Sequence, residues 1–367
     1  MTTTDLFDPC EFNGIRLQNR IALSPLTRTR SNDAGEAGPL QALYYAQRAS
    51  AGLLITEATA VTPGGRGGPN IPGLWNDDQI AGWRQVTDAV HAKGGVIFSQ
   101  LWHAGRLSHS SLSGGEPPVA PSTYQQPGQF FSAQGLVPYE EARALRLDEI
   151  PGVVELIRAA AVRAKAAGFD GVELHGAHSY LIDAFLRDMT NKRTDAYGGS
   201  IENRARLLME TMQAIVGVWG PERSGIRLSP IGHAYQAWDS DPEPLFTYVV
   251  ERLNDLKVGW LDLVEGDTGV SRTAEPSFDL QKLRRLFKGV TIANNLYDRE
   301  MAIAARAANS ADIIAFGRPF IGNPDLVERL RRNAPLTVAD PRTYYGGGAR
   351  GYTDFPTLEE EQAATAG

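Results

Sequence analysis

The sequence Gly171-Val172-Glu173-Leu174-His175-Gly176-Ala177-His178-Ser179-Tyr180 begins as an apolar run typical of a buried strand and ends in three polar rings. The preceding residues 167–170, Ala-Gly-Phe-Asp, have the pattern of a helix C-cap and a short turn. His175, His178 and Tyr180 should therefore begin the loop at the carboxyl end of the strand. Active sites of parallel α/β proteins lie at that edge of the sheet. The stretch predicts an α/β fold with functional side chains at one strand end.

The spacing of His175 and His178 leaves their role open. Two histidines three residues apart can donate hydrogen bonds to a carbonyl oxygen, bind a metal ion, or serve as structural side chains. The surrounding sequence has to separate these possibilities.

Eight short apolar runs alternate with longer amphipathic segments along the chain. The strands are expected at Ile21–Ser24, Leu53–Glu57, Val96–Leu101, Gly171–Leu174, Gly225–Ser229, Leu261–Val264, Val290–Ala293 and Ile313–Phe316. The clearest helices are expected at Asp77–Lys93, Asp148–Ala167, Glu202–Val218, Pro242–Lys257 and Asp298–Ala308. Eight such units predict a (β/α)8 TIM barrel. A doubly wound sheet is the alternative, but it requires a Gly-rich phosphate turn after the first strand, and Ser24-Pro25-Leu26-Thr27-Arg28 is not one.

Three segments fall outside this repeat. Residues 11–19 contain Asn13-Gly14, a strong hairpin signal, and predict a plug at the amino-terminal end of the barrel. Residues from about 103 to 146 form a long segment after the third strand, and its interspersed aromatic residues favour a lid over the carboxyl mouth. The aromatic tail, residues 340–367, is expected to pack on the barrel. One domain, residues 1–367, accounts for the chain.

Composition limits the function. The chain has 367 residues, of which 42% are hydrophobic and 22% charged, and no apolar run approaches the roughly 18 residues of a membrane helix. Its net charge of −7, without a basic run, argues against nucleic acid. Cys10 is the only cysteine, which excludes an internal disulfide, a cysteine-ligated iron–sulfur cluster and a Cys-rich zinc site. The first residues lack a signal-peptide pattern and favour a cytoplasmic location.

The residues at the predicted strand ends suit a bound planar cofactor. Carboxylates beside the histidines, as a divalent-metal hydrolase needs, and a strand-end lysine, as a Schiff-base aldolase needs, are not found. Gln100 can pair with an amide-like edge, Arg227 can stabilise electron-rich ring atoms, and Thr27 can donate to a carbonyl oxygen. Small Ala58 lets backbone approach a ring, and Arg318 lies where barrels commonly bind a phosphate. Flavin mononucleotide (FMN) fits this set.

From Phe12 to about Pro356 the chain resembles the Old Yellow Enzyme family of flavin-dependent ene-reductases, within it the N-ethylmaleimide and nitroester reductase branch. The motifs that carry the resemblance are Asn19-Arg20 with residues 24–28, residues 52–58, Gln100 to Arg106, Glu173 to Leu181, Asn191 to Asp195, Tyr197 to Arg204, Arg227 to Pro230, and Ala315 to Arg318 with Asn323-Pro324.

The resemblance implies roles for individual residues. The FMN ring would contact Pro25, Thr27 and Ala58, with Thr27 donating to the flavin C4 carbonyl, and its pyrimidine edge would contact Gln100 and Arg227. The phosphate would be held by Asn294, Asn295, Gly317 and Arg318. The family usually has glycine at the position of Asn294, although asparagine tolerates left-handed backbone well. His175 and His178 would hydrogen-bond the substrate oxygen, Tyr180 would donate the proton, and Trp102 and Tyr345 would line the substrate side.

The implied activity is a ping-pong reduction of activated alkenes, such as enones, maleimides, nitroesters or quinones, with FMN bound non-covalently and NADPH or NADH as the reductant. The alternative is a flavin-containing barrel that mainly binds phenolic or steroid-like ligands with little turnover. A metal-dependent lyase using His175 and His178 lacks an evident third ligand. The expected partners are small molecules, with no nucleic acid and no membrane, and the protein is expected to be a monomer or homodimer.

Overall fold

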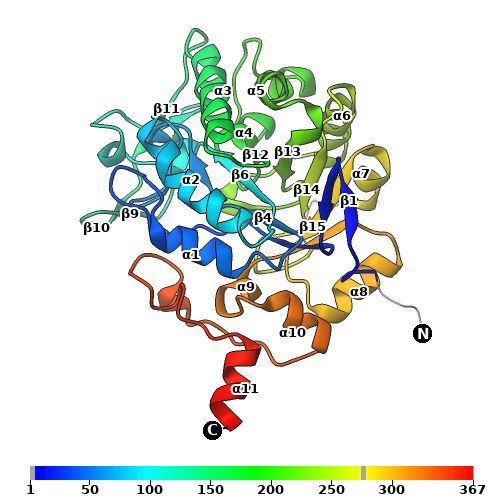
Figure 1. Ribbon diagram of the computed structural model, residues 1–367. Helices are drawn as coiled ribbons and strands as arrows, with labels where there is room; N and C mark the ends of the chain where they lie inside the picture. Colours follow the sequence, from blue (N-terminus) through cyan, green and yellow to red (C-terminus); the bar gives the residue numbers. More distant parts are fainter. Residues whose placement is uncertain (1–4, 274–277, 367) are drawn as a thin grey trace.

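The computed structural model, which describes residues 5–273 and 278–366, is a closed barrel of eight parallel strands (Figure 1). In barrel order the strands are β3 (Ile21–Leu23), β4 (Leu53–Ile55), β6 (Ile97–Trp102), β12 (Gly171–Gly176), β13 (Ser224–Leu228), β14 (Trp260–Val264), β15 (Val290–Asn294) and β16 (Ile313–Phe316). Pairing of β16 with β3 joins the last barrel strand to the first and closes the ring. The predicted (β/α)8 fold is confirmed, and all eight strands lie at the predicted places.

Most of the helices surround the barrel, whereas the C-terminal helix projects away from it (Figure 1). The helices are α1 (Pro39–Gln47), α2 (Asp78–His91), α3 (Ile150–Ala166), α4 (Leu181–Leu186), α5 (Ile201–Trp219), α6 (Pro242–Asp255), α7 (Gln281–Leu286), α8 (Arg299–Ala307), α9 (Arg318–Gly322), α10 (Leu326–Arg332) and α11 (Leu358–Ala366). Short 3-10 turns are η1 (Pro63–Gly65), η2 (Gly105–Leu107), η3 (Ser110–Leu112), η4 (Pro221–Arg223), η5 (Ala234–Gln236) and η6 (Pro341–Thr343). Among the described residues, no helix is long and apolar enough to cross a membrane.

The hairpin predicted at residues 11–19 is present. Strands β1 (Cys10–Phe12) and β2 (Ile15–Leu17) pair antiparallel around Asn13 and Gly14, both at positive φ. The fully buried ring of Phe12 lies 5.7 Å from Phe98 and 5.6 Å from Trp260, measured between ring centroids. These two aromatic residues belong to β6 and β14, so the hairpin seals the bottom of the barrel interior.

The long segment after β6 contains several small strands rather than an irregular loop. They are β7 (Val119–Ala120), β8 (Tyr124–Gln125), β9 (Gln129–Ser132), β10 (Gly135–Pro138) and β11 (Glu141–Ala144), while β5 (Thr59–Ala60) pairs with the end of β6. The Tyr124 hydroxyl donates to Gln236 Oε1 at 3.0 Å, which ties this segment to the loop after β13.

Two arginines that follow β3 hold the segment 343–352 near the C-terminus. Arg28 donates from Nε to the carbonyl of Tyr344 at 2.8 Å and from Nη2 to the carbonyl of Gly351 at 2.8 Å. Arg30 donates to the carbonyl of Thr343 at 2.9 Å, and its guanidinium lies 4.3 Å from the centre of the Tyr352 ring. The residues at the start of the barrel therefore fix the loop that carries Tyr345.

Candidate active site

A cavity of about 230 Å³ lies at the carboxyl end of the barrel strands. Most residues predicted for the site line it: Pro25, Thr27, Ala58, Gln100, His175, His178, Tyr180, Arg227, Arg318 and Tyr345. A second cavity of about 350 Å³ shares Leu26, Thr268 and Arg318 with the first and is also lined by Asn294, Asn295 and Gly317. The two adjoining spaces together have the size of a cofactor site, for which roughly 300–1,000 Å³ is usual.

His175 presents a neutral hydrogen-bond donor. Its Nδ1 accepts from the backbone N–H of Ala177 at 3.3 Å, which places the ring proton on Nε2. Burial, with the neighbouring His178 and Arg227, holds the pKa of His175 well below its usual value. The imidazole therefore remains uncharged at neutral pH and can still donate one hydrogen bond.

His178 is held by side chains from two other barrel units. Its Nε2 lies 2.7 Å from the hydroxyl of Thr268, and its backbone N–H donates to Ser229 Oγ at 2.9 Å. Burial lowers the pKa of His178 to about 3, and the charge of Arg227 contributes. Thr268 was missed in the sequence because its contact with His178 joins two loops that are 90 residues apart.

The backbone at His178 and Ser179 is strained, with φ of 59° and 68°. Non-glycine residues rarely adopt this left-handed conformation, and surrounding bonds maintain it here. The N–H of Ser179 donates to Asp183 Oδ2 at 2.7 Å, and Asp183 is itself paired with buried Arg187 at 2.8 Å. The buried ion pair thus fixes the turn that presents both rings to the cavity.

Tyr180 lies between two other aromatic rings. Its ring centroid is 4.9 Å from that of His175 at an interplanar angle of 85°, and 4.9 Å from that of Trp102 at 87°. Burial raises the pKa of Tyr180 well above its usual value, so the phenol retains its proton. Trp102, predicted to line the substrate side, is 3% exposed, lies behind Tyr180 and is absent from the described lining of the cavity. Its visible role is to orient the Tyr180 ring.

Glu173 orients Gln100 from inside the barrel. Its Oε1 accepts from Gln100 Nε2 at 2.9 Å, while its Oε2 accepts from Trp260 Nε1 at 3.1 Å. With its amide nitrogen engaged by Glu173, Gln100 keeps its carbonyl oxygen available as an acceptor. Burial, and then the charge of Asp262, raises the pKa of Glu173.

Arg227 is surrounded by acceptors on neighbouring strands. Its Nη2 donates to Asn294 Oδ1 at 3.1 Å, and its Nε lies 3.5 Å from Asp262 Oδ2 without a hydrogen bond. The buried Nε–H has no hydrogen-bond acceptor among the described residues, and Arg227 lines the same cavity as Gln100. A donor and an acceptor at one cavity wall match the edge of a flavin pyrimidine ring, so the residues present fit FMN.

The side chains of Asn294 and Asn295, which line the second cavity, are engaged by neighbouring loops and strands. Asn294 ends β15, and its side chain points to the barrel interior, where its Nδ2 donates to Asp262. The left-handed residues are instead Asn295, at φ 99°, and Leu296, at φ 57°. Asn295 uses its Nδ2 to bind the carbonyls of Glu265, Asp267 and Ser271. Both side chains therefore support the loops, which leaves the Arg318 guanidinium and backbone N–H groups as candidate phosphate donors.

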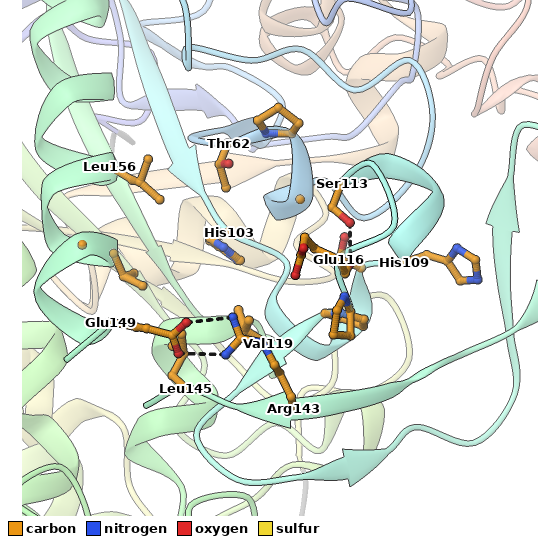
Figure 2. Close-up of a pocket in the computed structure, with 17 residues that line it drawn as sticks. Thr62, His103, His109, Ser113, Glu116, Val119, Arg143, Leu145, Glu149 and Leu156 are labelled. Carbon is orange, nitrogen blue, oxygen red and sulfur yellow. Dashed lines mark hydrogen bonds and ion pairs between the residues drawn. The ribbon is translucent and has the colours of Figure 1, made fainter. Parts of the chain in front are cut away.

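A larger cavity of about 690 Å³ lies between α3 and the segment after β6 (Figure 2). Arg143 and Glu149 form an ion pair on its wall at 2.8 Å, and His103 also contributes to the lining. Nδ1 of His103 accepts from the N–H of Gly105 at 3.0 Å, and burial lowers its pKa to about 4, so His103 has a structural task here. This cavity is the larger one, but it is not the candidate active site, because the residues at the strand ends line the two smaller cavities. No group of three or more His, Cys, Asp or Glu suited to a metal occurs among residues 5–273 and 278–366.

The profile of the NADH:flavin oxidoreductase / NADH oxidase family matches residues 5–337. The chain is 42% identical to 12-oxophytodienoate reductase 7 of Oryza sativa subsp. japonica, over 98% of this chain and 96% of that protein. Among solved structures, it is similar to the old yellow enzyme homologue from Zymomonas mobilis, with 45% identity, a TM-score of 0.93, and coverage of 96% of this chain and 100% of the other. It is also similar to morphinone reductase in complex with tetrahydroNAD, with 46% identity, a TM-score of 0.91, and coverage of 97% and 98%.

Proposed function

This chain belongs to the NADH:flavin oxidoreductase / NADH oxidase family, of the Old Yellow Enzyme type, and from this premise we propose how its residues carry out the reaction. The protein is an FMN-dependent alkene reductase that uses a nicotinamide coenzyme. When bound, FMN would supply the hydride-transfer chemistry between the coenzyme and the activated alkene. The roles of individual side chains follow from the cavity described above.

Pro25, Thr27 and Ala58 would hold the FMN ring. Gln100 and Arg227, which line the same cavity, would hold its pyrimidine edge. The support for this placement is that these side chains line one cavity and come from four different strand ends.

The substrate oxygen is bound by His175 and His178. A neutral imidazole N–H can stabilise the negative charge that develops on a carbonyl oxygen. Because burial keeps the pKa of both histidines low, this hydrogen-bonding capacity persists across the neutral range. Each donor of this kind contributes about 3 kcal/mol to transition-state stabilisation in other enzymes.

Tyr180 supplies the proton to the α carbon of the alkene. Its raised pKa keeps the proton on the phenol until charge builds up on the substrate, and the flanking rings of His175 and Trp102 limit its rotation. The single observation that carries this assignment is the 4.9 Å contact between the Tyr180 and His175 rings in the cavity that also contains Gln100 and Arg227.

We further propose that the substrates are alkenes activated by a ketone. The relatives named above are reductases of an oxo compound and of a morphinone, and a pair of neutral histidine donors suits a carbonyl oxygen. Nitroesters and quinones present oxygens to the same donors.

The decisive experiment separates the two half-reactions. Purified protein should be yellow; anaerobic NADPH or NADH should bleach it, and 2-cyclohexenone should restore the colour. Protein that takes up no FMN would end the proposal, and protein that is reduced but never reoxidised by an enone would favour a ligand-binding role with little turnover.

A further inference from the structure

A third cavity adjoins the candidate active site through Tyr345. Its volume is about 570 Å³, and Arg342, Tyr345, Gly346 to Gly348 and Arg350 contribute to its lining. Tyr345 lines both this cavity and the one that contains His175 and Tyr180, and it is 64% exposed. A long ligand at the site can therefore pass the Tyr345 ring into the third cavity. None of the roles assigned above uses this cavity.

The cavity carries excess positive charge in a chain whose net charge is −7. Arg342 donates from Nε and Nη2 to Asp340 Oδ2, at 2.9 Å and 2.7 Å. In the part of the chain that the structure describes, the exposed guanidinium of Arg350 forms no hydrogen bond or ion pair. Hydrogen bonding by Arg342, with a smaller contribution from the charge of Arg350, holds the pKa of Asp340 below its usual value. One guanidinium thus remains available to an anion, in the same cavity as a second one that is paired with Asp340.

The glycine loop adds backbone donors. The N–H groups of Gly347 and Gly348 bond to none of the described residues, whereas the N–H of Gly346 donates to Thr29 Oγ1 at 2.6 Å. A Cβ added to Gly347 or Gly348 would meet nothing within 4 Å, so the loop is open to a ligand on this side. Free N–H groups next to arginines are the usual surroundings of a bound phosphate.

This loop is fixed rather than free. Arg28 and Arg30 bind the carbonyls of Thr343, Tyr344 and Gly351, and the Tyr352 ring stacks on Tyr44 at 4.2 Å. A preformed loop loses less conformational entropy when it binds a ligand.

We propose that this third cavity binds the 2′-phosphate of NADPH, with Arg350 as the principal ligand and Arg342 as the second, and that it makes the enzyme prefer NADPH to NADH. The inference rests on the proposed function, because it is the coenzyme, bound with its nicotinamide in the active site, whose adenosine end extends past Tyr345. A phosphate monoester carries a charge of about −1.5 to −2 at pH 7, and a planar guanidinium can bind two of its oxygens. NADH presents only a hydroxyl group at this position.

The first experiment measures binding without turnover. Calorimetric titration of the yellow holoprotein with 2′,5′-ADP should give a dissociation constant at least ten-fold lower than that for 5′-AMP, and added salt should weaken the binding of 2′,5′-ADP more. Arg350→Ala should remove most of this difference and Arg350→Lys should restore part of it. Arg158→Ala, which deletes an exposed arginine on α3, is the matched control and should change nothing.

The second experiment measures coenzyme choice. Arg350→Ala should raise the KM for NADPH about ten-fold, leave kcat at saturation and the KM for NADH within two-fold, and leave reoxidation by 2-cyclohexenone unchanged. The double variant with Arg342→Ala should show a larger effect on NADPH alone. Equal affinity for 2′,5′-ADP and 5′-AMP, or equal KM changes for both coenzymes, would overturn the proposal. These outcomes are distinct from failure of the proposed function, in which enone would not reoxidise the flavin whichever reductant was used.

Discussion

At the scale of single residues, the site is built from neutral groups that keep their protons. His175, His178 and Tyr180 have pKa values shifted by burial in the directions that disfavour charge. A buried Arg227 provides the fixed positive charge beside them. The site therefore offers hydrogen-bond donors whose protonation state does not change around neutral pH.

Replacing Tyr180 with Phe tests the proton donor. The rate of flavin oxidation by an enone should fall by about 10²–10⁴, the usual contribution of a general acid, whereas flavin reduction should remain nearly intact. Stopped-flow absorbance of each half-reaction gives both rates. Equal losses in the two half-reactions would show that Tyr180 acts on the coenzyme step or on the fold instead.

Replacing Thr268 with Val tests the support of His178. The valine side chain has a similar shape but cannot hydrogen-bond to Nε2, so the imidazole is no longer fixed. Affinity for 4-chlorophenol should fall about three- to ten-fold, as expected for one net hydrogen bond, with FMN affinity unchanged. The perturbation of the flavin spectrum on phenol binding measures the affinity. Thr123→Val, at an exposed position, is the control, and an unaltered phenol affinity in Thr268→Val would remove Thr268 from the site.

At the scale of elements, a barrel strand such as β12 places apolar side chains in the hydrophobic core on one face and polar site residues on the other. In β12, Val172 and Leu174 pack outward in the hydrophobic core, while Glu173 and His175 lie on the other face. This alternation follows from strand geometry, so the same residues that predict a strand also predict which side chains meet at the mouth.

Glu173→Gln tests how β12 positions Gln100. Glu173 accepts from Gln100 Nε2 with one oxygen and from Trp260 Nε1 with the other. Glutamine has only one acceptor oxygen, so it cannot replace both hydrogen bonds in this geometry. The orientation of Gln100 should become mixed, and the dissociation constant of FMN should rise about ten-fold. Flavin fluorescence during titration of apoprotein measures this constant. Glu155→Gln, on the exposed side of α3, should have no effect, and a wild-type constant in Glu173→Gln would contradict the positioning role.

Comparison of sequence and structure shows which elements a pattern can reveal. The eight strands and the hairpin were predictable because apolar periodicity and Asn13-Gly14 are local signals. Thr268 was not, because its contact with His178 spans 90 residues and depends on barrel closure. The side-chain partners of Asn294 were not predictable for the same reason: as the last residue of β15 it faces Asp262 and Arg227 inside the barrel. The β strands within residues 103–146 were missed because their alternation is short and interrupted by Gly and Pro.

At the scale of the whole molecule, a buried cluster joins the first barrel unit to the loop 343–352. Glu57 is fully buried at its centre, and its Oε2 accepts from the N–H groups of Arg28 and Thr29 at 3.1 Å and 3.4 Å. Burial raises its pKa to about 7, despite these hydrogen bonds and the nearby arginines.

This pKa predicts a pH dependence of stability. An acid whose pKa is raised in the folded state binds more protons in the folded than in the unfolded state. Its contribution to the free energy of unfolding therefore declines as the pH rises from about 4.5 to about 7. The shift corresponds to about 3 kcal/mol. The free energy of unfolding of Glu57→Gln minus that of wild type should therefore be higher at pH 8 than at pH 5, by about 3 kcal/mol. Urea unfolding of apoprotein at both pH values measures this difference. A parallel pH profile in the two proteins would show that Glu57 does not titrate in this range.

The pairing of β3 with β16, together with the hold of Arg28 and Arg30 on residues 343–351, has a consequence for biosynthesis. A ribosome makes Thr27 early and Tyr345 more than 300 residues later, yet both line the same cavity. The cavity is therefore incomplete during nearly all of translation, and FMN has no complete site to bind until Tyr345 has been made. FMN binding is then the last step of maturation. A chain that terminates before Gly346 would be released without FMN and would be colourless.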